Sequence, residues 1–445
     1  MKKIITLFLV AMMCVSAFVA CAAPAEQGGN ATNPPAVDTP ANTGTPAAPA
    51  ASVSLNVVTS YGGDDGNRKN YEAGIAAYEA ATGNTVLDGS ATSNEEWKAK
   101  IMTDFETGTE PDVLFYFNGV DANPIIEANK VVSLDEIRAE YPDYASNMKD
   151  SLLVPSPVDG KVYSIPVNGY WEGMFVNKTV LAAAGVAVPG AGYTWEQFLA
   201  DCVKIKAAGF TPVAVSLQEV PHYWFDYTVF NNGSLENHLE LPAAADDAVA
   251  QKWAAGLADI TELYTKGYLP KNTLTATDAE TCQLMADGTA AFLIDGSWKL
   301  GWFRENAPDH LSDYAVAYVP AKGDRAATEI LGGISMGYYI TRKAWDDPAK
   351  REAAVKFVEM MTSDEIVSTF GATNVTALKN GVTPPSDADA ITLAAIEMTK
   401  GVTGMVGATQ DGLKGEARAD LFANVKNIVT GGMTAQDAFA SMLTK

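Results

Sequence analysis

Histidine, cysteine and positive charge are all scarce in this chain. Its 445 residues include 3 histidines and 4 cysteines, and 31 lysines and arginines face 54 acidic residues, a formal net charge of −23. His222, His238 and His310 lack metal-ligand spacing with one another or with a cysteine. A large negative charge disfavours binding to nucleic acid or to an anionic lipid surface. We therefore expect no metal and no nucleic-acid partner.

Catalytic and cofactor-binding motifs are also missing. The sequence has no G-x-S-x-G, no Walker loop and no dinucleotide fingerprint after its first predicted strand. The sequence therefore predicts a binding protein without a cofactor rather than an enzyme.

The N-terminus has the parts of a secretory signal over residues 1–20, where two lysines precede an apolar run. The four residues Phe18-Val19-Ala20-Cys21 are similar to a bacterial lipobox, in which cleavage leaves the cysteine to carry a lipid. We expect Cys14 to leave with the signal and Cys21 to anchor the protein to the outer face of the cell membrane. Plain secretion and a retained membrane span are the alternatives.

Residues 21–52 read as the lipidated cysteine followed by a disordered tether. They are rich in Ala, Pro, Gly, Thr and Asn and contain no aromatic residue, so they cannot bury enough apolar surface to offset their ordering entropy. A flexible segment of this length reaches roughly 30 Å. The remaining chain exceeds the size at which a single core usually splits, which predicts two lobes.

The other two cysteines, Cys202 and Cys282, lie in apolar-rich helical contexts. They could pair in an oxidising compartment, but two buried free thiols are the expectation, since free cysteine packs as a small hydrophobe.

The first part of the body predicts alternating strands and helices. A strand over 53–59 precedes a helix closed by Gly83, and a strand over 85–87 precedes a helix opened by a capping box at Ser93–Glu96. The apolar run 113–117 follows as a strand covered on both faces. This order predicts a parallel α/β sheet.

A second α/β stretch follows. Strands are predicted over 173–176, 212–216, 290–294 and 332–340, separated by helices, one of which opens with the capping box Thr194–Gln197.

Aromatic residues stand beside carboxylates and amides where predicted strands end, which is where open α/β sheets bind ligands. A sugar packs its apolar face on an aromatic ring and its hydroxyls on carboxylates and amides. A core role is the alternative for each tryptophan, and a helix cap for Asp295. The candidate ligand-binding residues are Tyr61, Asp64, Tyr116, Asn118, Trp171, Glu172, Glu219, Tyr223, Trp224, Asp295, Trp298, Gly332 and Gly333.

Several short motifs share an order and spacing that cover most of 53–445. The chain resembles the extracellular solute-binding proteins, family one, of ABC importers, the maltose-binding-protein-like group. The motifs that carry the resemblance are the lipobox, Glu110-Pro111-Asp112-Val113, Tyr163-Ser164-Ile165-Pro166, Phe175-Val176-Asn177-Lys178, Tyr193-Thr194-Trp195-Glu196-Gln197-Phe198, Ala291-Phe292-Leu293, Asp295-Gly296-Ser297-Trp298 and Gly332-Gly333.

The resemblance implies a two-lobed α/β fold of the periplasmic-binding-protein type II with a ligand cleft between the lobes. Lobe one would be 53–165 with 334–380, and lobe two 166–333 with 381–445. By position, Trp298 would stack on the ligand. Other matches to the family's ligand residues are Asp64, Tyr116, Glu172, Glu219 and Tyr223.

The implied function is capture of a carbohydrate, an oligosaccharide, by a lipid-anchored monomer that delivers it to the permease subunits of an ABC importer. The membrane would be contacted through the lipid alone. Two alternatives stay open: the same role for a peptide, polyamine or polyol, and a surface glycoside hydrolase using Glu172 and Asp295.

Overall fold

The computed structural model describes residues 52–63, 65–370, 375–382 and 386–445. The predicted signal, Cys21 and the candidate Asp64 lie outside the described residues. Residues Ala51–Lys445 are grouped as one compact unit, so the lobe boundaries stay a prediction. Within the described ranges, no helix combines the length and the apolar character that crossing a membrane requires.

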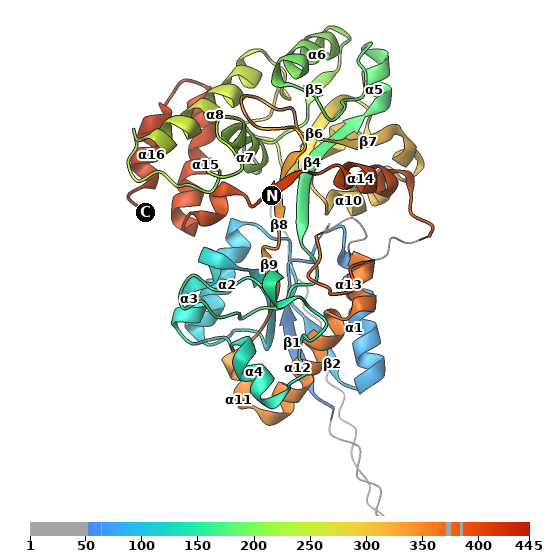
Figure 1. The fold of residues 1–445 in the computed structure, drawn as a ribbon, viewed down its shortest axis with the longest axis vertical. Helices are drawn as coiled ribbons and strands as arrows, with labels where there is room; N and C mark the ends of the chain where they lie inside the picture. The colour runs from blue at the N-terminus through green and yellow to red at the C-terminus, as the bar shows by residue number, and fades with distance from the viewer. Residues whose placement is uncertain (1–51, 64, 371–374, 383–385) are drawn as a thin grey trace, which may run out of the picture. The chain divides into compact units, whose positions relative to one another are not determined.

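The described residues form two β-sheets, and the first has the strand order β2-β1-β3-β9. Its strands β1, β2 and β9 are labelled in Figure 1. Its strands are β1 (Ser54–Val58), β2 (Thr85–Asp88), β3 (Val113–Phe117) and β9 (Met336–Ile340). β1 is parallel to both β2 and β3, and helices α1 (Arg68–Thr82) and α2 (Glu95–Thr107) connect them in sequence. β9 returns antiparallel to β3. The predicted alternation and parallel pairing are confirmed.

Helix α2 shows how the sequence sets an element's start. Its N-cap is Asn94, whose side chain accepts a hydrogen bond from the backbone N–H of Trp97. The capping box expected from Ser93 is therefore wrong, because the asparagine carbonyl one residue later caps the helix equally well. The predicted apolar face of Trp97, Ile101 and Phe105 is buried.

The second sheet has the order β10-β8-β4-β6-β5, and β7 pairs with β4. Strand β4 is antiparallel to β6, β7 and β8, while β5 is parallel to β6. The strands are β4 (Tyr170–Asn177), β5 (Thr211–Val213), β6 (Ala290–Gly296), β7 (Tyr314–Ala317), β8 (Glu329–Gly333) and β10 (Gly404–Val406).

Helices surround both sheets. The capping box predicted at Thr194 is confirmed, since its side chain and that of Gln197 cap the start of α6 reciprocally. The remaining α-helices are α3 (Asn123–Glu127), α4 (Leu134–Glu140), α5 (Lys178–Ala183), α6 (Trp195–Ala207), α7 (His222–Asn231), α8 (Ala248–Thr265), α9 (Asp278–Ala286), α10 (Lys299–Asn306), α11 (Arg342–Asp346), α12 (Pro348–Met361), α13 (Asp364–Phe370), α14 (Ala390–Lys400), α15 (Gly415–Val429) and α16 (Ala435–Met442), with short 3-10 turns at Gly119–Ala122, Asp150–Leu152, Pro308–Asp313 and Thr409–Gly412.

Strand β4 is buried on both faces, and its side chains alternate between two cores. Met174 and Val176 join the core built with α6, α7, α8 and α15. Trp171 and Phe175 join the core built with α9, α10 and α14. Alternation with a period of two residues is the property of a strand that produces this division.

The two cores also separate the body's cysteines. Cys202 belongs to the core that holds Met174, and Cys282 to the core that holds Phe175. Both are buried free thiols, as predicted.

The single strand predicted over 332–340 is wrong. The chain leaves the second sheet at Gly333, the end of β8, and enters the first sheet at Met336, the start of β9. At the exit Gly332 and Gly333 pair with Trp171 and Tyr170 of β4. A Cβ on Gly332 would lie 2.7 Å from the carbonyl oxygen of Tyr170, so glycine is needed where the two backbones pass so closely.

Candidate functional site

Three aromatic rings gather where strand β4 begins and strand β6 ends. The indole of Trp298 lies with ring centroids 6.0 Å from Tyr170 and 6.0 Å from Tyr223. All three side chains are partly exposed, unlike most large aromatic residues of this protein. They come from the start of β4, the start of α7 and the turn between β6 and α10. We call them the aromatic trio.

Gly296 fixes how the indole lies. A Cβ at this position would fall 2.2–2.4 Å from three carbon atoms of the Trp298 ring. The ring therefore rests directly on the backbone of Gly296, at the end of β6, and only glycine leaves that space free.

Three carboxyl groups lie near Tyr170 of the aromatic trio. Glu172 of β4 is 3% exposed and Asp226 of α7 is 1% exposed. Burial is the main cause that raises the pKa of both carboxyl groups well above the usual range, and neighbouring acids raise it further. Asp411, in the turn Thr409–Gly412, has its pKa raised to about 6, also mainly by burial. We call Glu172, Asp226 and Asp411 the acid group.

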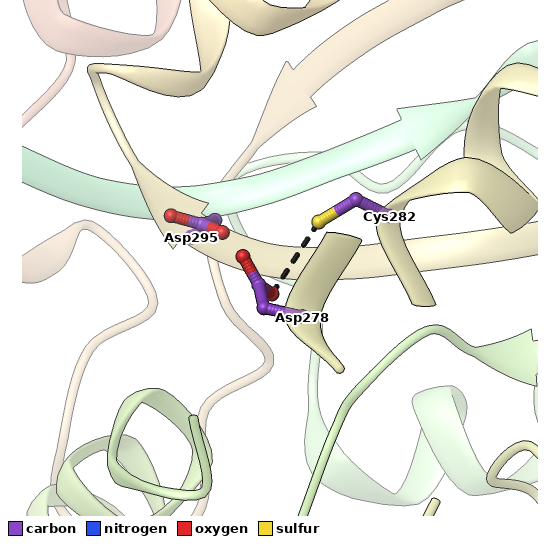
Figure 2. A group of neighbouring side chains, drawn as sticks. All are labelled: Asp278, Cys282 and Asp295. Carbon is purple, nitrogen blue, oxygen red and sulfur yellow. Dashed lines mark hydrogen bonds between the residues drawn. The ribbon is translucent and has the colours of Figure 1, made fainter. Parts of the chain in front are cut away.

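A second set of acids lies on the opposite face of the second sheet. Asp278 and Cys282 of α9 and Asp295 of β6 offer potential metal-ligand atoms within 4.8 Å of one another (Figure 2). The ammonium of Lys299 is 2.8 Å from Asp278 Oδ2 and 3.4 Å from Asp295 Oδ2. A buried lysine thus already supplies the positive charge, and the arrangement is an internal ion cluster rather than a metal centre.

Ionic contacts join this region to elements of the first sheet. Arg418 of α15, 1% exposed, lies 3.2 Å from Glu95 of α2 and 2.8 Å from Asp121. Lys98 pairs with the same two carboxylates at 3.2 and 3.1 Å. His222 lies near both cations, and its ring is tilted against that of Tyr223 with centroids 4.1 Å apart. Burial lowers the pKa of His222 to about 3.

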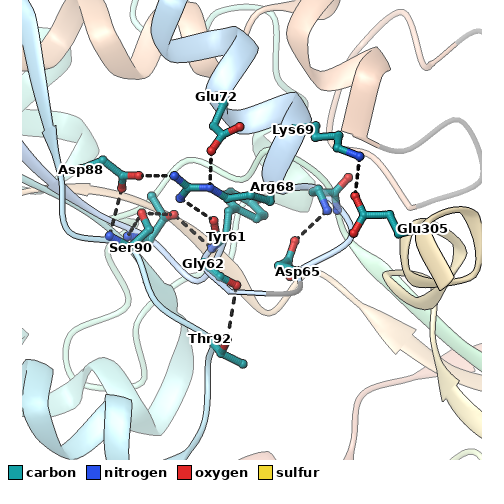
Figure 3. Close-up of polar contacts among 12 residues, drawn as sticks. Tyr61, Gly62, Asp65, Arg68, Lys69, Glu72, Asp88, Ser90, Thr92 and Glu305 are labelled. Atoms are coloured by element: carbon teal, nitrogen blue, oxygen red, sulfur yellow. Dashed lines mark hydrogen bonds and ion pairs between the residues drawn. The ribbon is translucent and has the colours of Figure 1, made fainter. Parts of the chain in front are cut away.

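The loop after β1 meets helix α10. Gly66 and Gly301 approach so closely that a Cβ on Gly301 would lie 2.3 Å from the Cα atom of Gly66. Lys69 of α1 also pairs with Glu305 of α10 at 2.8 Å (Figure 3).

Arg68 holds that loop in place. It donates to the Tyr61 carbonyl and to Glu72, and pairs with Asp88 at 2.8 Å (Figure 3). Thr92 adds a hydrogen bond to the Gly62 carbonyl. The loop is therefore braced by the first sheet on one side while it contacts α10 on the other.

Four of the predicted site residues come together. Glu172, Tyr223 and Trp298 lie at the aromatic trio or the acid group, and Asp295 lies close by in the Lys299 cluster. Asp295 is not the N-cap of α10, which is Trp298. It lies within β6, next to its last residue, and its side chain accepts a hydrogen bond from the N–H of Gly296.

The other predicted residues lie elsewhere. Trp171 and Trp224 are 0% and 1% exposed inside the hydrophobic cores, where their large rings fill space. Tyr61 stacks on Phe115, with ring centroids 4.8 Å apart, and is likewise buried. These placements favour packing roles for the three residues.

Three further candidates make polar or core contacts. Tyr116 is buried against Trp97, and Asn118 bonds to Tyr339 and Ser164. Glu219 is exposed and accepts from the backbone of α9. Whether any predicted residue touches a ligand stays a prediction.

Sequence reasoning missed Tyr170, Asp226, Asp411 and Arg418. Tyr170 could have been found, because the period of two along β4 places it on the same face as Glu172. Asp226 follows Tyr223 by three residues, the spacing of helix neighbours. The sequence around Asp411 and Arg418 carries no such signal.

Two β-sheets covered by helices are linked by crossings such as the one from β8 to β9. Aromatic rings and carboxyl groups lie at the ends of their strands. This arrangement defines a two-lobed binding protein of the type II architecture. The sequence profile of the bacterial extracellular solute-binding proteins matches residues 62–367. The chain belongs to this family.

Solved structures confirm the predicted fold. A chitin oligosaccharide binding protein has a TM-score of 0.76 and 22% identity, covering 88% of this chain and 98% of that one. The solute receptor AcbH, described as preferring galactopyranose, has a TM-score of 0.73 and 15% identity over 88% and 97%. The solute-binding protein RafE in complex with raffinose has a TM-score of 0.69 and 18% identity, covering 88% of this chain and 98% of that one. At these identities the likeness shows the fold alone.

The curated relatives match a smaller share of this chain than the solved structures do. Proteins named only as binding proteins, from Brucella abortus (strain 2308) and Brucella suis biovar 1 (strain 1330), are 23% identical over 255 residues. The match covers 55% of this chain and 58% of each relative, less than two thirds of their length.

Proposed function

We propose that this protein is the extracellular receptor of an ABC importer and that it captures an oligosaccharide. One observation carries the proposal: the indole of Trp298 lies partly exposed between Tyr170 and Tyr223, beside buried carboxylates. An aromatic face suits the apolar side of a pyranose, and carboxylates accept hydrogen bonds from its hydroxyls. The ligands named for the similar structures, chitin oligosaccharide, galactopyranose and raffinose, support the same class.

Capture would work by lobe closure. A ligand that contacts both lobes stabilises the closed form, so binding shifts an equilibrium between open and closed states. The contacts of Arg418 with Glu95 and Asp121, and of Gly66 with Gly301, are of the kind that a closed form makes. The permease would recognise that form, and the tether would raise the receptor's effective concentration near it.

A thermal-shift screen of the purified protein against mono- and oligosaccharides tests the ligand class. A ligand at about 100 times its dissociation constant should raise the free energy of unfolding by about 2.7 kcal/mol. Amino acids, peptides, polyols and polyamines serve as the comparison set. Stabilisation by that set alone would retain the receptor role and reject the carbohydrate.

The hydrolase alternative finds little support in the geometry. Glu172 pairs with Gly296, and Asp295 pairs with Gly173. Since paired residues share a face and neighbours along a strand alternate, the two carboxylates project from opposite faces of the sheet. They are poorly placed to flank one glycosidic bond, and we propose that the protein is not an enzyme.

The lipid anchor is a separate part of the proposal. Cys21→Ala is expected to release the protein from the membrane fraction into the soluble extracytoplasmic fraction, because it removes the acceptor of the lipid. Cys14→Ala, in the same leader, is the matched control and should leave the protein in the membrane fraction. Fractionation and immunoblotting measure both. Retention of the Cys21→Ala variant in the membrane would point instead to an uncleaved span.

A further inference from the structure

Two polar atoms at the acid group are buried without a hydrogen-bond partner among the described residues. Glu172 Oε2 is fully buried without a partner anywhere in the described ranges. The hydroxyl of Thr409 is also buried and unpartnered there. Thr409 is next to the acid group, since its N–H and that of Gln410 bond to Asp226. A buried polar group left unpaired is unfavourable, and a ligand that donates hydrogen bonds would satisfy both atoms.

The cations nearest to the acid group are engaged with other acids. Arg418 uses Nε and Nη2 on Glu95 and Asp121 and leaves Nη1 without a partner among the described residues, and Lys98 pairs with the same two carboxylates. Both cations act on Asp411 from a distance and partly offset the effect of burial on its pKa. Lys299 is engaged with Asp278 and Asp295. The acid group thus combines two buried carboxyl groups with a partly exposed one, and the described side chains form no ion pair with them. Burial raises the pKa of all three, so the free site favours their neutral forms and a bound cation would favour the ionised ones.

The aromatic trio adds a second attraction for positive charge. Tyr170 lies close enough to Glu172, Asp226 and Asp411 for their charges to act on its hydroxyl. Trp298 is packed on Tyr170. The faces of tryptophan and tyrosine attract cations, most strongly where water is excluded.

We infer that the ligand is a carbohydrate bearing a basic nitrogen, such as an amino sugar, whose ammonium lies against Glu172, Asp226 and Asp411 beside Tyr170 and Trp298. This inference rests on the proposed carbohydrate-binding function. Neutral hydroxyls can donate hydrogen bonds to these groups, but they leave in place the mutual repulsion that opposes ionisation of neighbouring acids. An ammonium donates three hydrogen bonds and also neutralises that repulsion.

The test compares three tetrasaccharides with one β-1,4-linked glucose backbone that differ only at carbon 2. Cellotetraose carries hydroxyl, chitotetraose carries N-acetyl, and its deacetylated form carries ammonium. Isothermal titration calorimetry at about pH 6, where a sugar amine is protonated, should show the deacetylated form binding about tenfold or more tightly than the other two.

Variants locate the effect. Glu172→Gln keeps the shape of the side chain but cannot ionise when an ammonium binds, and it should abolish most of the preference for the ammonium form. Glu416→Gln, an exposed acid of α15, is the matched control and should keep the preference.

The outcomes separate this inference from the function on which it rests. The amino-sugar inference would be wrong if the neutral tetrasaccharides bound as tightly as the deacetylated one, or if the deacetylated one did not bind. The carbohydrate role would then be decided by the thermal-shift screen. Binding of spermidine without binding of any sugar would overturn this inference and the carbohydrate role together, and would retain only the receptor role. An unchanged preference in Glu172→Gln would also overturn the assignment of the site.

Discussion

Trp298→Ala is expected to weaken carbohydrate binding by about 30- to 100-fold while the protein stays folded. A central aromatic anchor in a binding site is worth about 2–3 kcal/mol, and each 1.4 kcal/mol is tenfold in affinity. The indole is partly exposed, so its loss leaves the cores of the second sheet intact. Calorimetric titration measures the affinity, and circular dichroism checks the fold.

Two variants show whether the ring or its position matters. Trp298→Phe keeps an aromatic face and should recover most of the affinity. Gly296→Ala keeps the indole but places a Cβ where the ring now lies, 2.2–2.4 Å from its carbons. It should therefore lower affinity in the same direction as Trp298→Ala. Full affinity in Trp298→Ala would remove the ring from the site and would withdraw the observation that carries the proposed function.

Much of the fold could be predicted because local patterns decide local elements. The run 113–117 is apolar at every position and forms β3, and the threonine caps at Thr194 and Thr434 open α6 and α16. The change of sheet between β8 and β9 could not be predicted, because the apolar pattern continues through it. Which sheet a strand joins depends on partners far along the chain, such as Tyr170 for Gly333 and Phe115 for Tyr338.

Only the site residues that lie at the ends of strands could be predicted from the sequence. Glu172 and Trp298 could be predicted because they lie close to the start of β4 and the end of β6. Trp171 and Trp224 show the limit, since a tryptophan beside a strand end can point into the core or out of it. Asp411 comes from a short turn more than a hundred residues from any strand of the trio, and no local pattern marks its approach.

Gly301→Ala is expected to weaken ligand binding about tenfold without touching the ligand-binding residues. A Cβ on Gly301 would lie 2.3–2.6 Å from backbone atoms of Gly66, so α10 and the loop after β1 could no longer meet. The loop cannot easily yield, because Arg68 holds the Tyr61 carbonyl and Asp88 (Figure 3). If closure stabilises the bound state, the substitution should shift the equilibrium towards the open form and reduce the apparent affinity.

The change is well suited to separate closure from folding. Alanine in a helix interior is up to about 1 kcal/mol more favourable than glycine, so α10 itself should form at least as well. Gly415→Ala, in α15, meets nothing within 4 Å and is the matched control that should bind normally. Small-angle X-ray scattering with saturating ligand should give a larger radius of gyration for Gly301→Ala than for the control. Equal radii and equal affinities would mean that the contact between Gly66 and Gly301 takes no part in capture, and that the ligand is held by the aromatic trio and the acid group alone.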